Sequence, residues 1–225
     1  LRIKLPCGEC ISGQTITKDD MEHVTYNSNS KKAYVSGFDR EIYEICPNSC
    51  NKIDVAWRAP FKTRWIKTLE CDPNIMIVQC FNGGLYKVDL EASRILNQIK
   101  QTPEAIWSVV QKGNSLITVG ESSQIYEYSV GNINDDSLIP RISSSIYVQR
   151  PDGSSYAKRV VAYNQRFLAG QADGRLIAFD RRGSSTVGKA NEAIRDIAFD
   201  EANNVAYLCT ERGTVCRFSP EDGSV

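Results

Sequence analysis

Apolar and polar residues alternate along most of the chain in short runs, and polar turns separate one run from the next. The runs are rich in Val, Ile, Tyr and Phe, which favour β-strands. The turns carry Gly, Asn and Asp, whose backbones tolerate the positive φ of tight hairpins. The apolar residues of segment 90–100, LEASRILNQIK, fall loosely on one helical face, but its place in the pattern indicates a turn and a strand. The pattern predicts an all-β fold.

The alternation repeats as a unit of three strands joined by two turns. The unit occurs five times, at 21–45, 63–89, 105–129, 157–180 and 193–219. The first apolar residues of the five third strands are Ile42, Leu85, Ile125, Leu176 and Val215, which are separated by 43, 40, 51 and 39 residues. A period near 40 residues with antiparallel strands is typical of β-propeller blades.

A fourth strand follows the unit, as NKIDVAW at 51–57 and RILNQIK at 94–100. We therefore predict one β-propeller domain over residues 1–225, built of four-stranded antiparallel blades, of which about five are present. The predicted blades lie at approximately 21–57, 63–100, 105–149 and 156–190, with partial blades at 1–20 and 193–225. The longest separation places an insertion at 131–155.

The first and last segments of the chain both fall inside a blade. LRIKL resembles a third strand, and CRFSPEDGSV stops before a fourth. A propeller closes into a ring because closure hides the strand edges. Two arrangements satisfy this requirement: five blades closed with the help of the N-terminal strands, or a portion of a larger ring. We favour the portion of a larger ring.

Three segments resemble the WD40-repeat propellers. They are VDLEASRIL at 88–96 and FDRRGSS at 179–185, at the usual Trp-Asp turn, and GQADGRLIAFD at 170–180. The resemblance implies a propeller that binds proteins more often than it catalyses a reaction. The repeats diverge from the family, since they lack the Trp-Asp dipeptide and the Gly-His pair. Asp39 and Asp173 match the family's buried aspartate, where other blades have Asn82, Glu121 or Ser122, and Glu211.

Composition narrows the setting in which this propeller works. Lys+Arg and Asp+Glu are both 27, so the formal net charge is zero, and nucleic acid is not expected as a direct ligand. No segment has the length of apolar sequence that a membrane span needs. Eight Cys in 225 residues are too few for a disulfide scaffold. We expect an intracellular protein, cytoplasmic or nuclear, with no membrane association.

Two cysteine pairs lie one blade apart: Cys7 with Cys10, and Cys46 with Cys50. Four thiolates can hold a zinc ion. The separations of 39 and 40 residues equal the blade period, which places the pairs in successive turns too far apart to share one ion. We favour a disulfide within each turn, or free thiols, over a zinc site, and expect no cofactor. The other cysteines fall in or beside strands, where Cys acts as a small apolar residue.

The starts of the five first strands carry large aromatic or cationic residues. When MEHVT, TRWIK, AIWSV, AKRVV and AIRDI are aligned, the third residues are His23, Trp65, Trp107, Arg159 and Arg195. First strands line the channel of a propeller, so these residues are expected at one mouth of it. Arg64 and Lys158 add positive charge beside them. Trp and Arg are enriched at binding hot spots, and Arg pairs with carboxylates or phosphates. The alternative is that the Trp residues pack between blades and the Arg residues are solvated.

These observations favour a recognition or scaffold module that binds a protein partner, such as an acidic peptide, at the channel mouth. The partner is expected in a larger complex or in further domains of the same polypeptide. No catalytic residue is assigned, because no nucleophile elbow, phosphate-binding loop or His-Glu-x-x-His pattern occurs. Two alternatives stay open: a propeller-type hydrolase or lyase, and a platform subunit of a nucleic-acid-binding complex.

Overall fold

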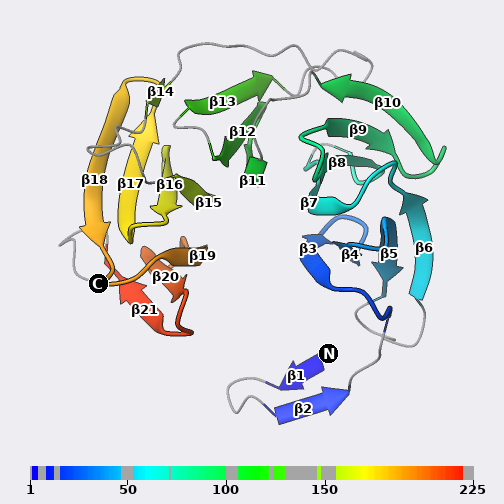
Figure 1. Ribbon diagram of the computed structural model, residues 1–225, viewed down its shortest axis with the longest axis horizontal. Helices are drawn as coiled ribbons and strands as arrows, with labels where there is room; N and C mark the ends of the chain where they lie inside the picture. The colour runs from blue at the N-terminus through cyan, green and yellow to red at the C-terminus, as the bar shows by residue number, and fades with distance from the viewer. Residues whose placement is uncertain are drawn as a thin grey trace. The chain divides into compact units, whose positions relative to one another are not determined.

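The computed structural model describes residues 2–4, 9–12, 16–46, 53–70, 72–99, 106–121, 124–129, 146–147 and 156–219. The chain divides into two compact units, residues 1–98 and 99–225. Within the described residues, all assigned secondary-structure elements are β-strands (Figure 1). The predicted all-β fold is confirmed.

The first unit holds a short hairpin and two four-stranded antiparallel sheets whose strands follow one another in chain order. The hairpin pairs β1 (Arg2–Lys4) with β2 (Glu9–Ser12). Blade 1 consists of β3 (Met21–Asn27), β4 (Lys32–Gly37), β5 (Glu41–Ile45) and β6 (Ile53–Arg58). Blade 2 consists of β7 (Thr63–Thr68), β8 (Ile75–Cys80), β9 (Leu85–Asp89) and β10 (Arg94–Ile99).

The second unit holds three antiparallel sheets, again with their strands in chain order. Blade 3 consists of β11 (Ile106–Lys112), β12 (Ser115–Gly120), β13 (Gln124–Ser129) and β14 (Ile146–Tyr147). Blade 4 consists of β15 (Ala157–Tyr163), β16 (Arg166–Gln171), β17 (Arg175–Asp180) and β18 (Gly183–Lys189). Blade 5 has three described strands, β19 (Ile194–Asp200), β20 (Val205–Thr210) and β21 (Val215–Phe218).

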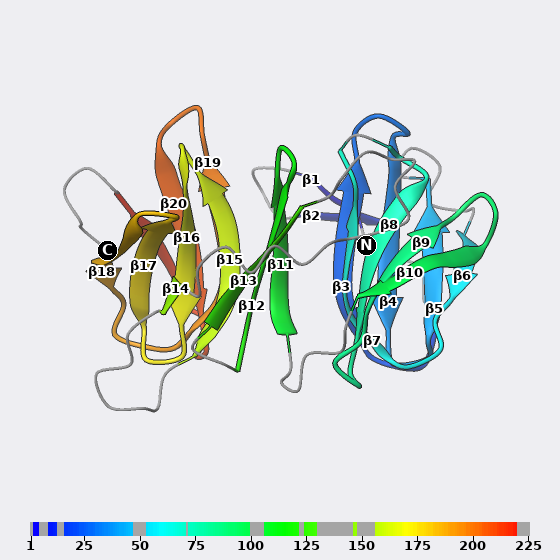
Figure 2. The same cartoon turned by 90° about the horizontal axis from the view of Figure 1, so that it is seen from above.

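Neighbouring blades pack against each other through their first strands within each unit. Strand β3 contacts β7 in the first unit, and β15 contacts both β11 and β19 in the second. Figure 2 shows β15 between these two neighbours. Successive antiparallel sheets joined in this way are the blades of a β-propeller, which confirms the predicted fold class. A single ring through both units stays a prediction.

Apolar side chains between adjacent blades form the core of each unit. Blades 1 and 2 bury Ile42, Trp57, Ile66 and Met76 between them. The second unit has one such cluster between blades 3 and 4 and another between blades 4 and 5. Complete burial of one large apolar side chain contributes about 1.5–3 kcal/mol relative to exposure. The blades are thus stabilised mainly by their neighbours.

The turn between the second and third strands uses the same local chemistry in three blades. The side-chain oxygens of Asp39, Asn82 and Asp173 each accept the backbone N–H two residues later, at 3.1, 3.0 and 3.1 Å. Asn and Asp stabilise turns in this way. Asp39 also accepts a 2.6 Å hydrogen bond from the hydroxyl of Tyr43. Burial first, and then Asp39, raise the pKa of Tyr43 to about 12.

Two further expectations from the sequence concern single segments. Within the predicted segment 90–100, the described residues 90–99 form a turn followed by strand β10 and not a helix, as predicted. The insertion at 131–155 lies outside the described residues except for β14. Within the described part of the chain, no helix has the length and apolar character to cross a membrane.

Candidate functional site

Each of the five first strands has a shift in register close to its start, where one residue is inserted as a β-bulge. We call the inserted residue the bulge position and the next residue the linking position. The bulge positions are Glu22, Arg64, Trp107, Lys158 and Arg195. The linking positions are His23, Trp65, Ser108, Arg159 and Asp196. Bulges redirect side chains and are frequent beside functional sites.

This register corrects the prediction that five large residues share one structural position. His23, Trp65 and Arg159 are at linking positions, whereas Trp107 and Arg195 are at bulge positions. In four of the five blades the cause is a buried apolar residue that follows the linking position and fixes the strand against the core, whereas Val24 at this place in blade 1 is 60% exposed. In blades 2 to 5 these residues are Ile66, Val109, Val160 and Ile197, which are 0, 2, 3 and 6% exposed.

Side chains at the linking positions contact the neighbouring blade. The rings of His23 and Trp65 lie 3.4 Å apart between centroids, across blades 1 and 2. The hydroxyl of Ser108 accepts the backbone N–H of Val160 at 3.3 Å, across blades 3 and 4. The Nε of Arg159 lies 3.0 Å from Oδ1 of Asp196, across blades 4 and 5. The linking position therefore holds adjacent blades together.

The bulge position of blade 2 belongs to a group of alternating cations and aromatic rings in the first unit. The guanidinium of Arg64 lies 4.1 Å from the ring centroid of Phe81. Phe81 meets Phe38 edge to face at 5.0 Å, and the Nζ of Lys62 lies 5.0 Å from the ring centroid of Phe38. A cation held over an aromatic face is attracted by the ring quadrupole. These two contacts hold Lys62 and Arg64 against the protein surface.

The bulge positions of blades 3, 4 and 5 carry aromatic and cationic side chains in the second unit. Trp107 stacks on Tyr156 at 5.9 Å with an interplanar angle of 22°. The Nζ of Lys158 lies 5.8 Å from the centroid of the same Tyr156 ring. Arg195 forms an ion pair with Glu211. Trp107, Tyr156, Lys158, Arg195 and Glu211 are called the bulge cluster below.

Positive charge exceeds negative charge in and beside the bulge cluster. Burial, followed by repulsion from Arg195, lowers the pKa of Lys158, while Glu211 acts in the opposite direction. The carboxylate of Asp196 pairs with Arg159, and that of Glu211 pairs with Arg195. Lys158 is thus the cation in excess, and an added anion would relieve its repulsion from Arg195.

Several residues that shape these sites were not predicted from the sequence. Tyr156 immediately precedes β15, and Phe38 and Phe81 immediately follow the second strands of blades 1 and 2. Phe38 and Phe81 share a place in the repeat, so an alignment of the turns would have paired them. Tyr156 has no such signal, because it is brought to Trp107 only by the packing of blade 4 on blade 3.

Two of the four cysteines weighed as zinc ligands, a site that the sequence disfavours, lie outside the described residues. Cys7 and Cys50 are not described, Cys10 belongs to β2, and Cys46 directly follows β5. Elsewhere, Cys80 is fully buried in the core of the first unit, as expected for a cysteine within a strand. Among the residues that the structure describes, no group of His, Cys, Asp and Glu could hold a metal ion.

Comparison with known proteins defines the fold without a family name. No protein-family model matches the chain, and no curated protein is significantly similar in sequence. Many solved structures share its fold. One is the crystal structure of the computationally designed Ika8 protein, with a TM-score of 0.64 and 12% sequence identity. The match covers 91% of this chain and 59% of the Ika8 chain. At this identity the likeness shows the fold alone.

Proposed function

We propose that this propeller is an intracellular recognition module of WD40-like type that binds an acidic segment of a partner protein through the bulge cluster. The observation that carries the proposal is the position of Lys158, which is held against an aromatic ring and near Arg195. A carboxylate or phosphate group placed between these two cations would accept charge-assisted hydrogen bonds from both. The stacked rings of Trp107 and Tyr156 offer an adjacent apolar contact.

The position of the cluster on its strands supports the same function. Its three bulge residues come from the starts of β11, β15 and β19, which are consecutive first strands. A peptide that lies across these strand ends can contact all three blades. Aromatic and arginine side chains at the centre of such a surface carry a large share of binding energy in known interfaces.

The test uses fluorescein-labelled synthetic peptides rich in Glu, Asp or phosphoserine, with neutral peptides of the same length as controls. Fluorescence anisotropy measures their affinity for the full chain. The double variant Lys158→Gln, Arg195→Gln should bind the best acidic peptide at least tenfold more weakly, because a hydrogen bond to a charged group contributes about 1.5–3 kcal/mol. The matched control is Lys189→Gln, Arg217→Gln, which removes two charges from β18 and β21.

Two results would contradict the proposal. Either no acidic peptide binds the unmodified protein, or both double variants bind the acidic peptide as tightly as the unmodified protein does. A single-stranded oligonucleotide is measured in parallel. Tighter binding of the oligonucleotide that weakens steeply with added salt would instead support the nucleic-acid platform.

A further inference from the structure

A cavity of about 350 Å³ lies between blades 3 and 4 within the second unit. It is lined by the end of β11, by β12 and β13, and by residues of β16, β17 and the turn after β17. Lys112, which lines it, is five residues along β11 from Trp107, or roughly 16 Å at the usual rise of a strand. The cavity is therefore separate from the bulge cluster. Its volume falls in the range of small-molecule sites.

The floor of the cavity is apolar. Ile117 and Phe179 are 3 and 0% exposed, and both belong to the core between blades 3 and 4. The rings of Phe167 and Phe179 stack at 5.5 Å between centroids with an interplanar angle of 26°. A flat or branched apolar group of a ligand would pack against the partly exposed ring of Phe167, which the buried ring of Phe179 supports.

The first of two carboxylates at the cavity is already neutralised by the protein. The guanidinium of Arg181 donates two hydrogen bonds to Glu127, at 2.6 and 3.1 Å. Glu127 also accepts a 2.6 Å hydrogen bond from the hydroxyl of Ser115. The charge and most of the acceptor capacity of Glu127 are thus used within the protein.

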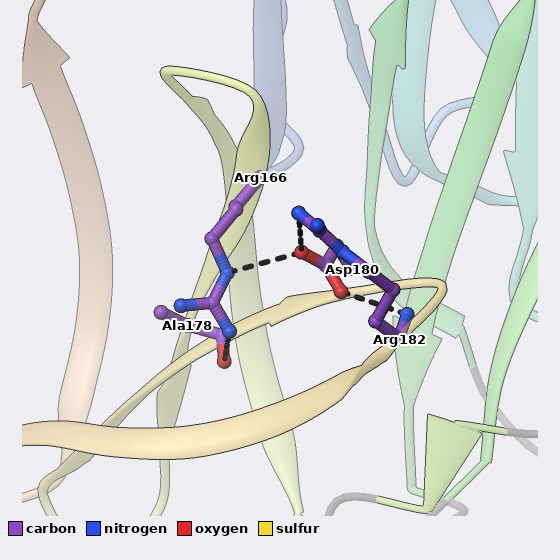
Figure 3. Close-up of polar contacts among 4 residues, drawn as sticks. All are labelled: Arg166, Ala178, Asp180 and Arg182. Carbon is purple, nitrogen blue, oxygen red and sulfur yellow. Dashed lines mark hydrogen bonds and ion pairs between the residues drawn. The ribbon is translucent and has the colours of Figure 1, made fainter.

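The second carboxylate, Asp180, lies near the guanidinium groups of Arg166 and Arg182 (Figure 3). It accepts the backbone N–H of Arg182 at 2.8 Å and lies 3.5 Å from Nε of Arg166. The backbone hydrogen bond from Arg182 is the main cause that lowers the pKa of Asp180. The side chain of Arg182 is 90% exposed and has only a long 3.4 Å contact with Asp180. Arg182 can therefore turn toward a ligand at small cost.

Lys112 is the lining cation that forms no ion pair with a carboxylate of the described residues. Its Nζ is buried and has no hydrogen-bond acceptor among the described residues, and it lies 6.0 Å from the ring centroid of Phe167. A buried ammonium group without an acceptor is costly, and such groups call for a specific partner. The lining side chains include three cations, Lys112, Arg181 and Arg182, and two carboxylates. The cavity thus has one positive charge in excess.

We propose that this cavity binds a monocarboxylate carried on an aromatic or branched apolar group. The carboxylate accepts hydrogen bonds from Lys112 and Arg182, and the apolar group packs on Phe167, whose ring is backed by the buried Phe179. The ammonium group of Lys112, which has no acceptor, matches a singly charged ligand, whereas Glu127 and Asp180 at the same cavity oppose a dianion such as phosphate. The chemistry fits two sources: a free small acid, or the C-terminal residue of a peptide.

The test compares the affinity of phenylpropionate with that of its neutral amide. Each compound is titrated into the full chain, and NMR measures its binding. The acid should bind at least tenfold more tightly than the amide. Lys112→Met should remove this preference and leave the melting temperature unchanged or higher, because it replaces a buried amine that lacks an acceptor with an apolar side chain. Lys189→Met is the matched control, since it changes a lysine of the outer strand β18, and it should retain the preference.

A second pair of probes separates the two sources of the carboxylate. An N-acetylated tripeptide that ends in phenylalanine is compared with its C-terminal amide. Tighter binding of the peptide acid than of phenylpropionate assigns the cavity to a chain terminus, and the reverse assigns it to a small acid. Equal binding of acid and amide, unchanged binding by Lys112→Met, preference for inorganic phosphate, or no binding of any probe would each overturn the proposal.

Discussion

Replacing Gly174 with alanine should destabilise the second unit far more than the same change at Gly213. Both glycines lie in the turn between the second and third strands of a blade, at φ +86 and +84°. Both donate a backbone hydrogen bond to the last residue of the second strand, at 3.1 Å. They differ in their surroundings. A Cβ at Gly174 would clash with the carbonyl oxygen of Ala190 and lie 2.7 Å from that of Glu192, whereas a Cβ at Gly213 would meet nothing within 4 Å.

The two costs can be estimated from this geometry. A left-handed backbone costs alanine about 1–2 kcal/mol, partly offset by about 0.4–1 kcal/mol from the lower entropy of the unfolded chain. Gly213→Ala should therefore cost about 1 kcal/mol. At Gly174 the backbone around Ala190 must also move. The N–H of Ala190 donates a 2.8 Å hydrogen bond to the carbonyl of Gly174, and this hydrogen bond resists the movement. Overpacking of this kind adds about 1–3 kcal/mol, for a total near 3 kcal/mol.

Urea unfolding followed by far-ultraviolet circular dichroism measures both variants against the unmodified protein. With equal slopes, the shifts of the two midpoints report the two losses of stability. In thermal unfolding, a loss of about 3 kcal/mol corresponds to roughly 6–12 °C for a domain of this size. Equal midpoint shifts for Gly174→Ala and Gly213→Ala would refute the reasoning, because the two positions would then differ only in a contact that has no energetic effect.

Two further predictions concern titratable groups. Burial raises the pKa of Cys80 to about 12. Iodoacetamide should therefore modify the exposed Cys209 of the native protein and reach Cys80 only after unfolding, as peptide mass spectrometry would show. Early labelling of Cys80 would contradict its burial. The folded-state pKa of Asp180 lies below its ordinary value of 3.8, so its ionisation stabilises the fold above that pH, and this contribution is lost as the pH falls through the folded-state value. Asp180→Asn should lower the urea midpoint at neutral pH and lose this difference in acid, whereas a difference that persists in acid would contradict the linkage.

The repeat predicts the blades because alternation and turn chemistry are local properties of the sequence. Segment 90–100 illustrates this point, since its helical spacing is misleading and its place in the repeat indicates the strand that β10 forms. The positive φ of Gly174 and Gly213 follows from the same turn chemistry. In blade 1 the corresponding turn places Arg40 at φ 69°, which composition alone could not indicate.

The site was harder to predict because it depends on register and on contacts between blades. An alignment of the starts of the first strands places Trp107 and Arg159 at one position. Aligning them on the buried Val109 and Val160 would have given the observed register, so that signal was present in the sequence. The ion pair between Arg159 and Asp196 had no such signal, since the two residues belong to different blades and meet only when those blades pack together.

The bulge explains how one strand start can serve both packing and the proposed recognition of a partner. In an uninterrupted strand, neighbouring residues point to opposite faces, and both faces of a blade are needed for packing. The inserted residue is released from the pairing, so its side chain can change without disturbing the buried residues beside it. Lys158 and Arg195 stand at this position, whereas Arg159 and Asp196, one residue later, join blades 4 and 5. Substitutions at the bulge position should therefore change what the surface binds, and substitutions at the linking position should change how firmly the blades hold together.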